Sequence, residues 1–129
     1  MGKVGEVTHP IEGQVVLLAG AQASVPLSDL SALVERTQKH LAGRREIYER
    51  RFERIDGPGD AVFYLAEDGC WATVGKELGF SDRETDAVRR SHESQFRRAG
   101  RRLDRTDEFE TALEIRDVVA IAPPAERSR

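Results

Sequence analysis

The sequence has little of what marks a secreted, membrane-spanning or zinc-binding chain. One cysteine in 129 residues excludes an intramolecular disulfide framework and a cysteine-rich zinc site. No stretch approaches the roughly 18 apolar residues of a transmembrane helix, so we expect no membrane partner. The sequence also lacks a large excess of positive charge. Its 20 basic and 23 acidic residues give a formal net charge of −3, which is not typical of a general nucleic-acid binder.

A signal peptide is a weak alternative to a cytoplasmic location. The run Val15 to Ala21 is apolar, and Ala21-Gln22-Ala23 has the small-x-small spacing of a cleavage site. The residues before it carry no net positive charge, and the run is at the short end of what a signal peptide needs. We therefore expect a cytoplasmic protein, and the single cysteine fits a reducing compartment.

The composition is that of one small folded domain. Hydrophobic residues make up 39% and charged residues 33% of the chain, a mixture that excludes a wholly disordered or collagen-like chain. We expect a single domain over residues 10–121, preceded by a flexible arm over residues 1–9 and followed by a disordered tail over residues 122–129.

Hydrophobic periodicity predicts helices in the first half. Residues 10–22 favour a helix that is nearly apolar all round and so mostly buried, with a strand over 14–18 as the competitor. Ser28 is a suitable N-cap for the next helix. Apolar positions from Leu30 to Ile55 alternate at spacings of three and four, which predicts one helix of about 27 residues. Gly43 can weaken or bend it. A helix this long in a small chain indicates packing on a second copy.

The second half contains clear start and stop signals. Residues 56–60 (Asp-Gly-Pro-Gly-Asp) predict a turn, and residues 61–66 predict a strand. Asp68 can cap a helix over 70–78, and Gly79 suits its C-terminal end, with Phe80 as the following hydrophobic contact. Ser81 and Glu84 form a capping box that opens a helix over 82–103.

The segment from residue 109 to residue 121 fits two structures. Phe109, Thr111, Leu113 and Ile115 alternate with Glu110, Ala112, Glu114 and Arg116, as in a strand. A helix with Asp107 and Glu110 as a possible cap also fits. We choose the strand, because the strand at 61–66 needs a partner for its backbone groups. The predicted fold is helix-dominated α+β. It has a long central helix, a helix-turn-helix-like pair and a small two-stranded antiparallel sheet.

Arginine is concentrated in the last predicted long helix. Only three of the 20 basic residues are lysines, and between Ala87 and Leu103 six arginines face one acid, a local charge of +5. The candidate residues for binding nucleic acid or a protein partner are Arg83, Arg89, Arg90, Arg97, Arg98, Arg101 and Arg102. Solvated helix faces commonly carry such charges as well.

The order short helix, glycine turn, capped helix resembles a helix-turn-helix, and the preceding helix and strand resemble a winged-helix module. The start of the second helix counts against DNA binding, because Asp82, Glu84 and Asp86 repel phosphate. Thr85 also occupies a position where such a core normally has an aliphatic side chain. We favour two packed helices over a DNA reader.

No residue pattern assigns catalysis. Cys70 follows a helix start, where the dipole can lower a thiol pKa, but a small buried side chain is the better interpretation. His92 lies on an apolar stripe and is best interpreted as a core histidine. The three histidines and the cysteine match no metal-binding spacing. We therefore predict no catalytic residue, no metal, no cofactor and no small-molecule substrate.

Two segments, residues 71–92 (WATVGKELGFSDRETDAVRRSH) and residues 108–116 (EFETALEIR), resemble small uncharacterised proteins of haloarchaea. The resemblance covers residues 11–121, and it implies a cytoplasmic location and no established activity. The expected function is thus a non-enzymatic, self-associating interaction module. The alternative is a winged-helix-like transcriptional regulator that uses the arginine-rich helix 82–103, and an enzyme or ligand binder using Cys70 or His92 is a third, weaker hypothesis.

Overall fold

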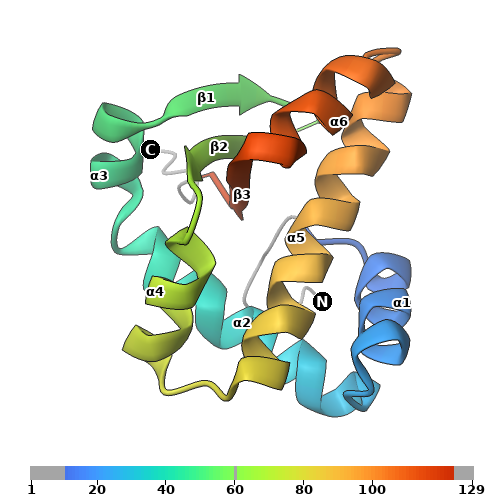
Figure 1. Ribbon diagram of the computed structural model, residues 1–129, viewed down its shortest axis with the longest axis vertical. Helices are drawn as coiled ribbons and strands as arrows, with labels where there is room; N and C mark the ends of the chain where they lie inside the picture. Colours follow the sequence, from blue (N-terminus) through green and yellow to red (C-terminus); the bar gives the residue numbers. More distant parts are fainter. Residues whose placement is uncertain (1–10, 60, 124–129) are drawn as a thin grey trace, which may run out of the picture.

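The computed structural model describes residues 11–59 and 61–123. Within these ranges, the chain forms six helices and one three-stranded antiparallel sheet (Figure 1). The expected helix-dominated α+β class is confirmed. The expected arm over residues 1–9, Pro10 and residues 124–129 of the expected tail lie outside the described residues.

The elements follow one another closely. The helices are α1 (Gly13–Ala23), α2 (Leu27–Ala42), α3 (Arg45–Arg51), α4 (Cys70–Leu78), α5 (Asp82–Arg102) and α6 (Thr106–Ile115). The strands are β1 (Glu53–Asp56), β2 (Val62–Glu67) and β3 (Arg116–Ile121). No single helix of the described chain is long and apolar enough to cross a bilayer. Only α1 and α2 together meet that test, and they are bent by 115°.

Helix α5 is the centre of the molecule. It packs against α1, α2, α4, α6 and β3, and Figure 1 shows it running between α1 and α4. It buries a full stripe of side chains, which comprises Ala87, Val88, Ser91, His92, Gln95, Phe96, Ala99 and Gly100. The Phe96 ring stacks on Phe109 of α6 and meets Phe63 of β2 edge to face, so α5 joins the sheet to the helices.

The prediction of one helix from Leu30 to Ile55 is wrong. Helix α2 ends at Ala42, α3 is a separate helix of 7 residues, and the chain becomes extended at Phe52 to form β1. Gly43 follows the last residue of α2, in accord with the expected weakness there. The apolar residues kept their spacing of three and four beyond the end of α2, because α3 and β1 also direct apolar side chains toward the core. Ser28 is not the cap, since α2 already begins at Leu27.

The sheet has three strands where the sequence analysis expected two. Strand β2 lies in the middle, with Ile55 of β1 opposite Phe63 and Ala120 of β3 on its other side. The predicted strand over 109–121 is also wrong in part, because residues 106–115 form α6 and only 116–121 form β3. The backbone changes at Arg116, where φ is −132° and ψ is 153°. Pairing with β2 stabilises the extended part.

The ends of α4 and α5 agree with the sequence signals. Gly79 has φ 74°, the left-handed region, and the N–H groups of Gly79 and Phe80 donate to the carbonyls of Lys76 and Gly75 in a Schellman ending. The capping box of Ser81 and Glu84 is present. Asp68 makes no cap, because Gly69, with φ 96°, takes the N-cap position of α4 without a side-chain hydrogen bond.

The outer edge of β3 is closed by side chains. Trp71 Nε1 donates to the Val118 carbonyl at 3.0 Å. The Ala120 N–H donates to His92 Nδ1 at 2.9 Å, and Gln38 Nε2 donates to the Ala120 carbonyl at 2.6 Å. These bonds replace a further strand, so β3 presents no open edge in this stretch. Ala122 is held as well, because its N–H donates to Gln38 and its carbonyl accepts from Arg45.

Candidate interaction surfaces

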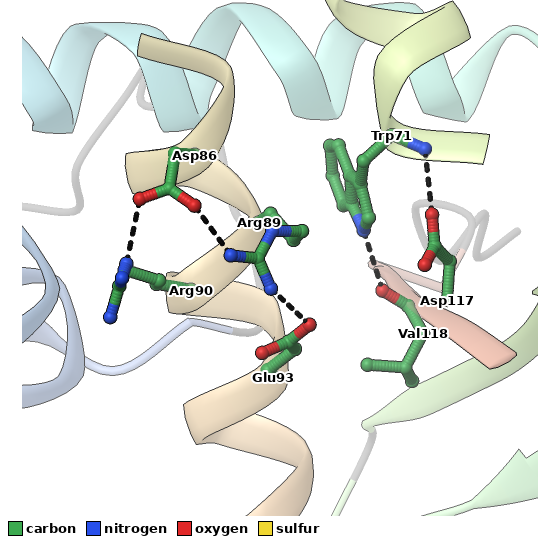
Figure 2. A network of polar contacts seen from close by, with 7 residues as sticks. All are labelled: Trp71, Asp86, Arg89, Arg90, Glu93, Asp117 and Val118. Atoms are coloured by element: carbon green, nitrogen blue, oxygen red, sulfur yellow. Dashed lines mark hydrogen bonds and ion pairs between the residues drawn. The ribbon is translucent and has the colours of Figure 1, made fainter. Parts of the chain in front are cut away.

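The first half of α5 carries a closed network of ion pairs. Asp86 binds both Arg89 and Arg90, and Arg89 also donates to Glu93 at 2.6 Å, as Figure 2 shows. Partial burial alone would raise the pKa of Asp86, but the hydrogen bonds from Arg90 and Arg89 outweigh it and lower that pKa. Two of the arginines predicted to meet a partner are therefore neutralised within their own helix.

Glu12 collects two more of the predicted arginines. Its carboxylate accepts from Arg98 at 2.8 Å and from Arg102 at 2.7 Å, and it also accepts from Gln95. Hydrogen bonds from Arg102, Gln95 and Arg98 lower the Glu12 pKa to about 2. Because Glu12 is the N-cap residue of α1, this cluster fixes the start of α1 to α5 and gives Arg98 and Arg102 a structural role.

The other predicted arginines lie along the more exposed side of α5. These are Arg83, Arg97 and Arg101, and they share one side of α5 with Arg90, which pairs with Asp86. The four recur at intervals of seven, seven and four, which places them on one stripe about 27 Å long. Arg97 pairs with Glu110 of α6 at 2.9 Å. Within the described chain, Arg83 and Arg101 form no ion pair, and both are exposed. The stripe thus holds two uncommitted guanidinium groups, one near each end of the helix.

An open cleft of about 290 Å³ lies between α3 and α4, and Cys70 and Tyr48 line it. The Tyr48 hydroxyl lies 3.5 Å from Cys70 Sγ. Burial raises the pKa of the Cys70 thiol, so at neutral pH this residue is a thiol and not a thiolate nucleophile. The expected role as a small packed side chain fits this environment.

His92 lies in the core, as its position on the apolar stripe suggested. Its ring is fully buried, meets the Trp71 ring edge to face at 4.6 Å, and accepts the Ala120 hydrogen bond at Nδ1. In the described part of the chain, no group of three or more histidine, cysteine or carboxylate residues could hold a metal ion. His92 therefore has a structural role, because it accepts a hydrogen bond from the outer edge of β3.

One surface, on α1, was not predicted from the sequence. That helix was expected to be mostly buried, yet Leu17 is 52% and Leu18 is 58% exposed. Ala21 shares their side of α1, and Leu27, 47% exposed, begins α2. We call these four residues the α1 face. The sequence feature that could have indicated this surface is the absence of charged residues from α1. That composition fits an interface as well as a core.

A family model, described as a domain of unknown function (DUF8048), matches residues 9–123. The chain belongs to this family. No curated protein and no solved structure matches the DUF8048 domain. The family match agrees with the resemblance of residues 71–92 and 108–116 to uncharacterised proteins.

Proposed function

We propose that the DUF8048 domain is a small, non-enzymatic interaction module that associates with a second copy of itself through the α1 face. The observation that carries this proposal is the exposure of Leu17, Leu18 and Leu27 on and beside an uncharged helix. Large exposed apolar side chains that lie side by side, as Leu17 and Leu18 do on α1, mark protein interaction sites in soluble proteins. Covering them removes apolar area from water, which is the main driving force of association.

The charge of the α1 face also suits a symmetric contact. In a two-fold dimer each residue lies near its own equivalent, so a charged face would repel itself. The acid at the start of α1, Glu12, is turned toward α5, where its carboxylate pairs with Arg98 and Arg102. A second copy can therefore approach this neutral face without like-charge repulsion.

Light scattering at micromolar concentrations tests this proposal. We expect Leu18→Glu to halve the mass of the assembly, because it places a charge in the apolar contact. Ile115→Glu is the matched control, since Ile115 is an exposed apolar residue on α6, and it should leave the mass unchanged. A monomeric native protein, or an unchanged mass for Leu18→Glu, would refute self-association through this face.

Nucleic-acid binding is the second candidate, and the arginine stripe on α5 favours it. The close approach of α4 and α5 at Gly75 and Thr85 fits a helix-turn-helix-like pair. The burial of α5 weighs against it, since its exposed residues are Asp82, Arg83, Arg101 and Arg102. Salt-dependent binding to duplex DNA that weakens in Arg83→Glu and Arg101→Glu, but not in the exposed control Arg50→Glu, would support it. Equal binding by all three variants would reject it.

We also infer a cytoplasmic location and a haloarchaeal source. The single cysteine and the scarcity of lysine support this inference, together with the resemblance of residues 71–92 and 108–116 to haloarchaeal proteins. Detection of the native protein in the soluble lysate fraction of its own cells, and not in the membrane fraction or the medium, tests the location.

A further inference from the structure

Strand β1 is the open edge of the sheet. The strand order is β1-β2-β3, and side chains of Trp71, His92 and Gln38 occupy the outer edge of β3. Among the described residues, no backbone group outside the hairpin bonds to β1. Figure 1 shows β1 at the margin of the molecule, away from α2 and α5. An unpaired edge of this kind is a template for another strand.

The hairpin decides which backbone groups of β1 face outward. The Gly57 N–H donates to the Ala61 carbonyl at 2.8 Å, so Gly57 points toward β2. Successive residues of a strand alternate in direction. Ile55 and Glu53 therefore also bond to β2, whereas the N–H and C=O groups of Arg54 and Asp56 face the open edge.

We propose that β1 pairs in antiparallel fashion with β1 of a second copy, with the two-fold axis at Ile55. This register places Arg54 opposite Asp56 of the partner subunit, and Asp56 opposite Arg54 of the partner subunit. Each of these opposite pairs exchanges two N–H···O bonds, because both residues direct their backbone groups outward. The two sheets then form one continuous sheet across the axis.

Charge selects this register over the alternatives. Because only Arg54 and Asp56 face outward, a two-fold axis must pass through residue 54, 55 or 56. An axis at Arg54 places arginine opposite arginine, and an axis at Asp56 places aspartate opposite aspartate; like charges directly opposite destabilise strand pairs. The axis at Ile55 pairs opposite charges twice.

The side chains are available for this contact. Asp56 is 70% exposed, and Arg54 uses Nε for Asp56 and Nη1 for Glu49. Its Nη2 has no partner among the described residues, and guanidinium carries five N–H donors in all. Arg54 can thus keep both existing bonds and still bind Asp56 of the partner subunit. This surface is separate from the α1 face and does not depend on it.

Disulfide trapping tests the register directly. In a Cys70→Ser background, we expect Ile55→Cys to form a covalent dimer under mild oxidation. The two residues at the axis form a non-hydrogen-bonded pair with Cα atoms about 4.5 Å apart, within disulfide reach. Glu53→Cys is the control, because its two copies lie roughly 14 Å apart at 3.4 Å per residue, beyond that reach. Equal trapping of both variants, or none of Ile55→Cys, would overturn the proposal.

A charge exchange supplies the second test. Both variants carry Leu18→Glu, so that association through the α1 face does not contribute to the measured mass. Arg54→Asp makes the β1 edge entirely acidic and Asp56→Arg makes it entirely basic, so we expect neither variant to pair with itself through β1. An equimolar mixture should form the mixed pair, detected by sedimentation velocity after far-ultraviolet circular dichroism has confirmed that both variants fold. Failure of the mixture to associate through this edge would reject the register. Ile55→Cys trapping that persists in Leu18→Glu would show this contact even where self-association through the α1 face fails.

Discussion

Gly75 allows α4 and α5 to approach each other, and replacing it provides a quantitative test of that contact. A Cβ atom at position 75 would overlap Thr85 Oγ1 and lie 2.9 Å from Thr85 Cγ2 and 3.1 Å from Thr85 Cβ. Thr85 cannot turn away freely, because it is β-branched and its hydroxyl donates to the Ser81 carbonyl at 2.9 Å. The helices must therefore move apart in Gly75→Ala.

Two opposing effects determine the size of the change. Alanine is favoured over glycine inside a helix by about 1 kcal/mol. Overpacking a tight contact costs about 1–3 kcal/mol. We expect Gly75→Ala to lower the free energy of unfolding by about 1–2 kcal/mol, since the overlap involves several atoms of a constrained side chain. Thr85→Ala removes the two overlapping atoms, so Gly75→Ala/Thr85→Ala should regain most of that loss.

Urea unfolding followed by circular dichroism measures all four members of this double-mutant cycle. We expect a coupling free energy of about 2 kcal/mol between positions 75 and 85, within the range for residues in contact. Additive effects, or a Gly75→Ala variant more stable than the native protein, would refute the packing of α4 on α5 described above.

Two further predictions concern the contacts that hold α1 and β3. The Glu12 pKa, about 2 in the folded protein against an ordinary 4.5, predicts stability that is complete above pH 4.5 and is lost as the pH falls toward 2. Glu12→Gln should flatten this pH dependence and lower the free energy of unfolding at neutral pH by about 1 kcal/mol, a small value because the Glu12 side chain is 35% exposed. Urea unfolding at pH 3 and pH 7 measures the effect, with Glu110→Gln as the control. If Glu12→Gln kept the native change of unfolding free energy between the two pH values, as the control should, the prediction would be contradicted. Trp71→Phe leaves the buried Val118 carbonyl without its donor and should cost about 2 kcal/mol in thermal or urea unfolding, whereas native stability would rule out the side-chain closure of the β3 edge.

Local chemistry accounts for the parts of the fold that the sequence predicted well. Helix α4 has the predicted bounds, and α5 begins at the predicted capping box, because a left-handed glycine at Gly79 and the Ser81–Glu84 exchange depend only on neighbouring residues. The turn that joins Gly57 to Ala61, where the Gly57 N–H donates to the Ala61 carbonyl, was predicted for the same reason. The core position of His92 followed from helical spacing on α5.

Long-range pairing decided the rest. Nothing local separates residues 53–56 from the helical pattern before them; hydrogen bonds to β2 make them a strand. The ion pairs of Arg98 and Arg102 with Glu12 span 86 and 90 residues, so an apparently free basic helix proved to be largely neutralised. The exposure of Leu17 and Leu18 likewise depends on which side of α1 meets α5. By itself the sequence determined both ends of α4 and the start of α5, since caps and glycine turns act over a few residues. Burial, strand pairing and charge neutralisation join distant residues, so the tertiary structure decided them, together with the ends of α2, α3 and α6.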